Sequence, residues 1–343
     1  MNKKEERILD LIGFPKIKAK LDQNESPFNV PEEILKEAAD SLKYLNYYPT
    51  EKLYDEVRYL YSEYANVKFE NVWLAPGVDL YFDEYFYHFK NKGLVAAPRP
   101  TFFLFEKEAY HMGYEIIGSI LKEPEFKLDH SFLNYSKQAD FSYIDNPNNP
   151  TGNLIIEKEN FEEIVKLNKP VLLDEAYYEF CNVTFVDLIE KYEKLGIIRT
   201  LSKVFCLAGA RVTILIAGKE ISKIMNKDIM RFRISTTSLL LAKLVLENRK
   251  YIYDVIKKLN YEKEKMINEI RKLGLKVYNS YTNFILIYSE IDNLAEKLKE
   301  KGILVKDVSF QMGKGYIRVS IGDSETNKYF IEKLKEIKDS NEK

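Results

Sequence analysis

The stretch "RTLSKVFCLAGAR", residues 199–211, places a lysine between hydroxyl side chains in a segment that is otherwise mainly apolar. Thr200, Ser202 and Arg211 supply hydroxyl groups and a guanidinium, which together suit a phosphate group. Lys203 differs from them, because an amine that is partly removed from water is a nucleophile toward an electrophilic carbon. The stretch therefore indicates a ligand that carries both a phosphate and an electrophile.

Short apolar runs surround this stretch and alternate with segments of helical periodicity. Several of these runs are apolar on both faces, as in a sheet that helices cover on each side. The alternation predicts an α/β fold with a mostly parallel, seven-stranded sheet. The strands are expected at 72–75, 93–98, 115–120, 141–145, 170–177, 196–201 and 212–218, with helices near 80–91, 102–112 and 159–168.

The last third of the chain has a different pattern. Residues 236–272 have helical periodicity without proline or glycine, which predicts one long linking helix. Four apolar segments and two further helical segments follow it, which is typical of a smaller α+β domain. We predict an N-terminal arm over residues 1–30, a large ligand-binding domain over 31–240 and a small domain over 241–343.

The composition argues against several classes of function. With 52 basic and 53 acidic residues and a formal net charge of −1, the chain shows no preference for nucleic acid or an acidic membrane surface. Cys181 and Cys206 are the only cysteines, which predicts neither a disulfide framework nor a metal site and fits the cytoplasm. The charged start "MNKKEERILDLIGF" does not match a signal peptide, and no run approaches the ~18 apolar residues of a membrane span.

Unusual residues follow several predicted strands, which is where ligands bind in open α/β sheets. Val78 and Asp79 open a helix, so their backbone N–H groups favour an anion. The octet "DNPNNPTG", residues 145–152, predicts a rigid turn that holds Asn149 extended. Asp174 ends a nearly apolar strand, where a carboxylate is costly unless it meets a cation or a donor. A phosphate-bearing aldehyde with a basic ring nitrogen, such as pyridoxal 5′-phosphate, uses all of these groups at once.

The chain resembles the fold-type I pyridoxal-phosphate enzymes, and within them the histidinol-phosphate aminotransferase group of the class I and II aminotransferases. The motifs "NPNNPTG", "DEAYYEF" and "RTLSKVFCLAGAR" occur in that family's order and spacing. The resemblance runs from "LDQNESPF" (21–28) to "YIRVSIGD" (316–323). It implies pyridoxal phosphate as cofactor, a small amino donor and a 2-oxo acid as reactants, and a homodimer with shared active sites.

The resemblance implies roles around the cofactor ring. Lys203 would hold the cofactor aldehyde covalently and later move the proton at the substrate Cα. Asp174 would pair with the pyridine nitrogen and keep it protonated. Asn149 and Tyr177 would bond the ring hydroxyl, and Phe102 would stack on the ring, where the family more often has tyrosine.

The resemblance also implies the groups that hold the phosphate and the substrate. Those around the cofactor phosphate are Thr200, Ser202, Arg211, the amides of Val78 and Asp79, and Tyr48 across a dimer interface. Val78 stands where the family usually has serine, which removes a hydroxyl but keeps the backbone donor. Arg318 would receive the acidic group of the substrate, and Asn24 lies in the segment that closes over it. Lys306 stands where the histidinol-phosphate enzymes usually have a second arginine, so a point charge replaces a bidentate donor.

The resemblance implies transamination between L-histidinol phosphate and 2-oxoglutarate, a reaction of histidine biosynthesis. Two cations, Arg318 and Lys306, suit a phosphate dianion better than a single carboxylate. An aminotransferase for aromatic or other L-amino acids is an alternative, with Arg318 on the carboxylate. A decarboxylase of the threonine-phosphate type is another. A non-enzymatic protein with this fold is the last, and Lys203 and Asp174 argue against it because binding alone would need neither.

Overall fold

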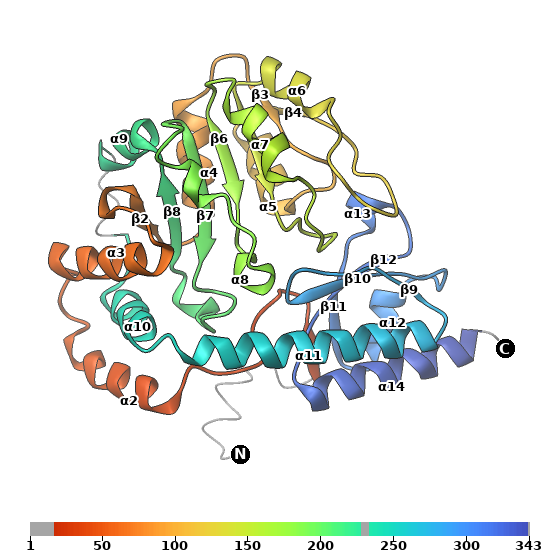
Figure 1. Ribbon diagram of the computed structural model, residues 1–343. Coiled ribbons are helices and arrows are strands. Elements are labelled where there is room, and N and C mark those ends of the chain that lie inside the picture. Colours follow the sequence, from red (N-terminus) through yellow and green to blue (C-terminus); the bar gives the residue numbers. More distant parts are fainter. Residues whose placement is uncertain (1–16, 228–232, 342–343) are drawn as a thin grey trace.

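The computed structural model describes residues 17–227 and 233–341. Two sheets organise the chain (Figure 1). The larger has seven strands in the order β2-β8-β7-β6-β5-β3-β4, and the smaller has five in the order β1-β11-β12-β10-β9. The prediction of an α/β fold with a mostly parallel seven-stranded sheet and a smaller α+β unit is confirmed.

The large sheet is parallel apart from β8. Its strands are β2 (Val72–Ala75), β3 (Leu94–Ala96), β4 (Glu115–Ile117), β5 (Phe141–Asp145), β6 (Val171–Asp174), β7 (Leu195–Thr200) and β8 (Thr213–Ala217). Because β8 runs antiparallel to β7, its first residue, Thr213, lies opposite the last residue of β7, Thr200. The loop between these two strands therefore leaves and re-enters the sheet at the edge where the parallel strands end.

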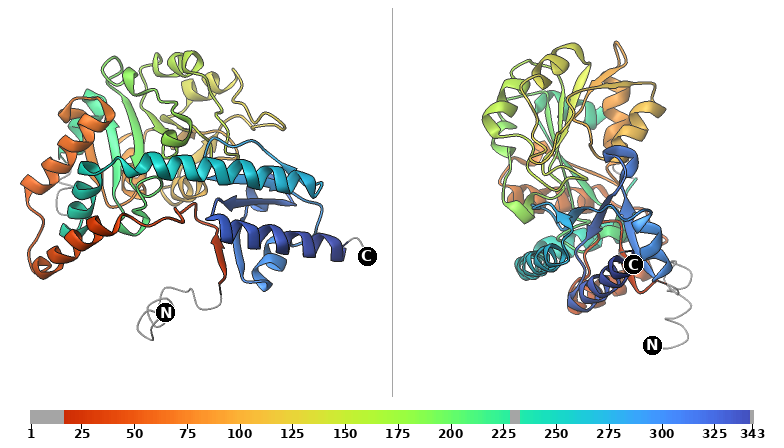
Figure 2. Two further views of the ribbon diagram at one scale, coloured as in Figure 1. Left: turned by 60° about the horizontal axis from the view of Figure 1, so that its bottom comes forward. Right: turned by 90° about the vertical axis from the view of Figure 1, so that its right-hand side faces the viewer.

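Helices cover both faces of the large sheet, as its doubly apolar strands require (Figures 1 and 2). Successive strand residues point to opposite faces, so Ile214 joins one hydrophobic core and Leu215 the other. The core that contains Leu215 includes helices α4 (Asp79–His88), α5 (Phe103–His111) and α9 (Lys219–Lys227). The opposite core includes α2 (Glu32–Asp40), α3 (Glu51–Ala65), α6 (Phe132–Gln138), α7 (Lys158–Val165), α8 (Tyr178–Cys181) and α10 (Thr236–Glu247). Short 3₁₀ helices lie at Ser41–Tyr44, Phe69–Asn71, Val186–Leu188 and Ala208–Ala210.

The small sheet combines segments from both ends of the chain. Its strands are β1 (Ala19–Leu21), β9 (Lys276–Val277), β10 (Phe284–Tyr288), β11 (Ile303–Asp307) and β12 (Tyr316–Ser320). Its helices are α11 (Tyr251–Lys272), α12 (Leu294–Glu300), α13 (Ser309–Met312) and α14 (Ser324–Asn341). Strand β1 pairs in parallel with β11, so the chain begins in the small sheet and then crosses to the helices of the large one. Of the predicted N-terminal arm, residues 1–16 lie outside the described residues.

The stretch expected as one helix over 236–272 forms two. Helix α10 ends at Glu247, and α11 begins at Tyr251 after a turn at 248–250. Asn248 closes α10, because its backbone N–H and its side-chain amide both donate to the carbonyl of Leu244. Helix α10 packs on α3 and α2, whereas α11 packs on α14, β9 and β10, so packing pulls the two helices apart. The chain passes from the large sheet to the small one at this turn (Figure 2).

No helix in the described part of the chain is both long and apolar enough to cross a membrane.

Candidate active site

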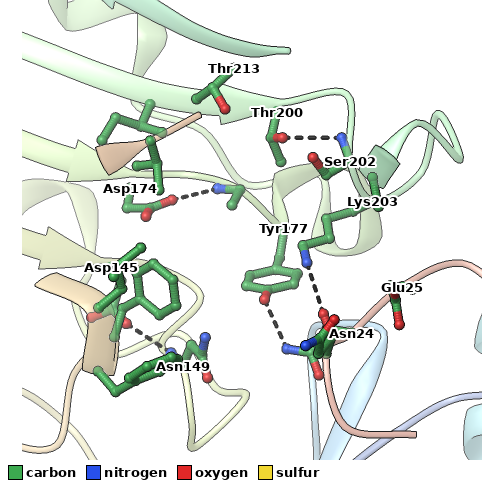
Figure 3. A pocket seen from close by; sticks show the side chains of 18 of the residues that line it. Asn24, Glu25, Asp145, Asn149, Asp174, Tyr177, Thr200, Ser202, Lys203 and Thr213 are labelled. Carbon is green, nitrogen blue, oxygen red and sulfur yellow. Dashed lines mark hydrogen bonds between the residues drawn. The ribbon is translucent and has the colours of Figure 1, made fainter. Parts of the chain in front are cut away.

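The carboxyl edge of the large sheet opens into a cavity of about 540 Å³ (Figure 3). Residues that end or begin strands form its floor: Asp145, Asp174, Thr200 and Thr213. The small domain supplies Lys306 and Arg318, and the segment 22–25 after β1 supplies a further wall. The predicted site residues that line it are Asn24, Val78, Phe102, Asn149, Asp174, Tyr177, Thr200, Ser202, Lys203, Arg211, Lys306 and Arg318. The structure therefore brings most of the predicted site together.

Lys203 reaches into this cavity from the loop between β7 and β8 (Figure 3). Its Nζ donates to the backbone carbonyl of Gln23 at 3.3 Å and lies 5.7 Å from the ring centre of Tyr177. Burial lowers the pKa of Lys203 to about 8, and the positive charge of Arg318 acts in the same direction. About a tenth of this amine is therefore uncharged at pH 7, far more than for an ordinary lysine, which makes it an available nucleophile and base.

Asp174 ends β6 on the floor of the cavity and is 7% exposed. One oxygen accepts the backbone N–H of Ala176 at 2.9 Å, and the other accepts the hydroxyl of Tyr143 at 3.0 Å. Burial raises the pKa of Asp174 to about 6, although these hydrogen bonds oppose the rise. A cation placed beside this buried carboxylate would favour its ionised form.

Asp145 is a cavity residue to which the sequence analysis gave no role. It ends β5 directly beside Asp174, its register partner on β6. Its carboxylate accepts hydrogen bonds from the hydroxyl of Thr101, the side-chain amide of Asn148 and the backbone N–H of Asn149. Burial raises the pKa of Asp145 to about 7. Its position at the end of a predicted strand, like that of Asp174, was the signal that could have found it.

Arg318 enters the cavity from β12 of the small sheet. One terminal nitrogen donates to Oδ1 of Asn149 and the other to the backbone carbonyl of Asp22, both at 2.6 Å. Its Nε is buried and has no hydrogen-bond partner among the described residues. Burial also lowers the pKa of Arg318. The guanidinium thus retains a free donor in a cavity, which suits an anionic group of a ligand.

Asn24 connects the segment after β1 with both domains. Its side-chain amide donates to the hydroxyl of Tyr177 at 2.9 Å, and its Oδ1 accepts from the hydroxyl of Ser320 at 3.1 Å. The backbone of Asn24 is left-handed, with φ of 55°, and its N–H donates to the same Ser320 hydroxyl. Burial raises the pKa of Tyr177 to about 12, so this hydroxyl stays protonated and can donate.

The far end of the cavity is built from two loops. Thr200 accepts the backbone N–H of Ser202 at 3.0 Å, which fixes the start of the loop after β7. Arg211 ends the same loop in a left-handed conformation, with φ of 55°. Its guanidinium lies 3.7 Å from the carboxylate of Asp79, the first residue of α4. Asp79 itself does not line the cavity, although its neighbour Val78 does.

Tyr48 does not line the cavity of its own chain. It lies in the connection before α3, and 85% of its surface is exposed.

The residues fit pyridoxal phosphate in three respects. An amine with a lowered pKa, Lys203, lies in the same cavity as a buried carboxylate, Asp174, that forms no ion pair with the described residues. The hydroxyls of Thr200 and Ser202, the Arg211 guanidinium and the start of α4 gather at one end, where a phosphate is favoured. Phe102 adds an aromatic face to the lining.

The fold and this cavity define an α/β transferase of fold type I. The chain belongs to the class I and II aminotransferase family, whose model matches residues 16–334. It is similar to a histidinol-phosphate aminotransferase of Thermoanaerobacter sp. (strain X514), with 36% identity over 93% of this chain and 92% of the relative.

Solved structures show the same architecture. The crystal structure of a histidinol-phosphate aminotransferase from Clostridium acetobutylicum matches with a TM-score of 0.85 and 25% identity, over 94% of this chain and 99% of that one. The enzyme of the same name from Sinorhizobium meliloti, solved in complex with pyridoxal-5′-phosphate, matches with a TM-score of 0.87 and 19% identity. That match covers 98% of this chain and 94% of the other.

Proposed function

We propose that the protein is a pyridoxal-phosphate-dependent aminotransferase that transfers the amino group of L-histidinol phosphate to 2-oxoglutarate, as in histidine biosynthesis. The observation that carries this proposal is the pairing of Lys306 and Arg318, register partners on β11 and β12 that both line the cavity. Two adjacent cations match a phosphate dianion, whereas one carboxylate requires a single cation. The name shared by the relatives supports the same substrate.

Each residue around the cofactor ring has one proposed task. When bound, pyridoxal phosphate supplies an electron-withdrawing ring that weakens the bonds at the substrate Cα. Lys203 holds the cofactor aldehyde and then moves the proton at the substrate Cα, for which its lowered pKa suits it. Asp174 keeps the ring nitrogen protonated, because a buried carboxylate stabilises a cation beside it. Asn149 and Tyr177 orient the ring through its hydroxyl, and Phe102 packs against its face.

The remaining predicted residues divide between the two anionic groups. Thr200, Ser202, Arg211 and the amides of Val78 and Asp79 bind the cofactor phosphate. Arg318 and Lys306 bind the phosphate of the substrate, and Asn24 closes over it. These assignments are supported by the cavity, which has hydroxyls and the start of α4 at one end and the two small-domain cations at the other.

We further propose a cytoplasmic homodimer in which Tyr48 completes the phosphate site of the other subunit. Large apolar side chains cluster on the surface at residues 42–48, where Leu42, Tyr44, Leu45, Tyr47 and Tyr48 are all exposed. Such a cluster is unfavourable in water and is typical of a surface that another chain covers. A second copy fits, because it would bring the Tyr48 hydroxyl to the proposed phosphate site.

A half-reaction screen tests the substrate. Holoenzyme is mixed with histidinol phosphate, glutamate, phenylalanine, tyrosine or phosphothreonine, and the cofactor spectrum is followed together with carbon dioxide release. We expect histidinol phosphate and glutamate to convert the cofactor. Carbon dioxide released from phosphothreonine would instead identify a decarboxylase.

The variant Lys306→Ala tests whether the acidic group of the substrate is a phosphate or a carboxylate. It should lower kcat/KM for histidinol phosphate about 10-fold to 100-fold, because a charged hydrogen bond contributes about 1.5–3 kcal/mol. Glutamate should be hardly affected. Lys301→Ala, which removes an exposed lysine outside the cavity, is the matched control. Equal losses for both substrates, or faster wild-type turnover of phenylalanine or tyrosine, would contradict the proposal.

A further inference from the structure

The proposed chemistry gives no role to the buried carboxylate of Asp145, which lines the cavity. It is 2% exposed and lies on the cavity floor beside Asp174. Its two oxygens contact different parts of the site. Oδ1 accepts the hydroxyl of Thr101 at 2.7 Å and the amide of Asn148 at 2.9 Å. Oδ2 accepts the backbone N–H of Asn149 at 2.8 Å (Figure 3).

These contacts connect the residues proposed to hold the cofactor ring. Thr101 directly precedes Phe102, the aromatic residue of the lining, and Asn149 is the residue proposed to bond the ring hydroxyl. Both loops are also tied to the small domain. Gln311 of α13 donates to the backbone carbonyl of Thr101 at 2.7 Å, and Arg318 donates to the side chain of Asn149 at 2.6 Å. Asp145 therefore lies at the centre of a hydrogen-bonded chain between the domains.

An ionised carboxylate is the group that satisfies this arrangement. The partners of Asp145 all donate, and a carboxylate has only acceptor sites. An asparagine at position 145 would place its N–H₂ group opposite groups that already donate, on one side or the other. The backbone N–H of Asn149 can only donate, so it could not accept a hydrogen bond from that group. Burial raises the pKa of Asp145 to about 7, so the acceptor form predominates at pH 8.

We propose that Asp145 is a positioning residue that fixes the cofactor ring by joining the loop of Phe102 to the loop of Asn149. The two loops follow different strands, β3 and β5, and the Asp145 carboxylate joins them through its two oxygens. This inference rests on the proposed use of pyridoxal phosphate and is independent of the substrate.

The test compares holoenzymes at pH 8. In Asp145→Asn we expect a weaker visible circular-dichroism band of the bound cofactor and faster loss of the cofactor on dilution. With glutamate as donor, kcat should fall about 10-fold to 100-fold, as expected for small displacements of reacting groups. KM should change much less, because the substrate cations stay in place. Thr101→Val, which removes one donor and keeps the carboxylate, should change the same readouts in the same direction by a smaller factor.

Asp140→Asn is the matched control. Asp140 precedes the same strand at its opposite end, accepts the backbone N–H groups of Lys92 and Gly93, and does not line the cavity. We expect this control to lower thermal stability and to leave the cofactor band, the cofactor loss rate and kcat unchanged.

Two results would overturn the proposal. One is an Asp145→Asn holoenzyme that loses stability like the control but keeps all three cofactor readouts within twofold. The other is a Thr101→Val holoenzyme that matches wild type in all of them, which decides the question even if Asp145→Asn does not fold. A wild type that binds no pyridoxal phosphate would overturn the proposed cofactor as well. If the wild-type holoenzyme binds pyridoxal phosphate but does not react with histidinol phosphate, only the proposed substrate is overturned.

Discussion

Lys203 obtains its proposed reactivity from residues that are distant in the sequence. Burial in the cavity is the main reason for its lowered pKa, and Arg318 of the small domain adds to it. Asp174 and Glu25 oppose the shift, because negative charges favour the ammonium form. The sequence could indicate a nucleophilic lysine, but the balance of these charges required the assembled fold.

The reactivity of Lys203 should depend on pH in a defined direction. The rate at which pyridoxal phosphate attaches to the apoprotein should rise with pH through a midpoint near 8 and level off above it, because the uncharged amine is the reacting form. Arg318→Met should move this midpoint upward, since it removes a cation that disfavours the ammonium. The measurement is the growth of cofactor absorbance, followed by borohydride reduction and peptide mapping.

Lys263 provides the internal control for this labelling. Burial lowers its pKa to about 8 as well, but it lies outside the cavity and donates to the backbone carbonyl of Thr282. The reduced pyridoxyl group should be found on the Lys203 peptide and not on the Lys263 peptide. Label on Lys263 would show that a lowered pKa is sufficient for the reaction without the cavity. A midpoint that Arg318→Met leaves in place would show that the charge of Arg318 does not tune Lys203.

Among the elements, the turn from β2 into α4 restricts the residue at position 77. Gly77 has a φ of +131°, which L side chains rarely adopt. A Cβ at this position would come within 2.3 Å of the Asp79 carboxylate and 2.9 Å of the Arg211 guanidinium. The turn therefore needs glycine for its backbone and also for the space that Arg211 occupies.

Gly77→Ala should weaken cofactor binding as well as stability. The left-handed backbone alone costs about 1–2 kcal/mol, and the displaced Arg211 should accelerate loss of the cofactor. Gly274→Ala is the control, because Gly274 also has a positive φ, of +73°, but nothing lies within 4 Å of an added Cβ and it is outside the cavity. Thermal unfolding and cofactor release measure the two effects. Equal cofactor release from both variants would contradict the role of Arg211.

The elements also show what the sequence could predict. The strands of the large sheet were found because their apolar runs are the sequence signal of buried strands. The turn at 248–250 was missed, because its residues have ordinary helical propensity and the packing of α10 and α11 on different partners causes it. Strand β1 was missed because its three residues form a strand only through pairing with β11.

The site, too, could be predicted only where it does not depend on strand pairing. The rule that ligands bind at strand ends located Asp174 and Thr200, which the structure places in the cavity. The role of Asp145 depends on register, since only the pairing of β5 with β6 places it beside Asp174. A single sequence does not contain that register directly.

At the scale of the whole molecule, the proposed dimer makes each site dependent on two chains. Lys203→Ala subunits mixed with Tyr48→Phe subunits should recover activity, because one site of each mixed dimer carries neither change. With random pairing the recovered activity should be about a quarter of wild type, since half of the dimers are mixed and each has one intact site. The measurement is activity after joint unfolding and refolding, with the subunit mass checked by light scattering.

Mixing Lys203→Ala with the double variant Lys203→Ala/Tyr48→Phe is the control, because no pairing of these chains gives an intact site. A fully active monomer, or recovery no greater than that of the separate parents, would show that Tyr48 acts within its own chain or not at all.

The path of the chain between the two sheets restricts how the domains can move. The polypeptide crosses twice, once after β1 through residues 22–31 and once at the turn 248–250 (Figures 1 and 2). Because the small domain is joined to the large one at these two points, its rigid-body motion would be a rotation about the line between them. Gln23 and Asn24 belong to the first tether, so the cavity wall that they form would shift little during such a swing. The bond from Gln311 to Thr101 lies on α13, outside both tethers, so such a swing would have to break it.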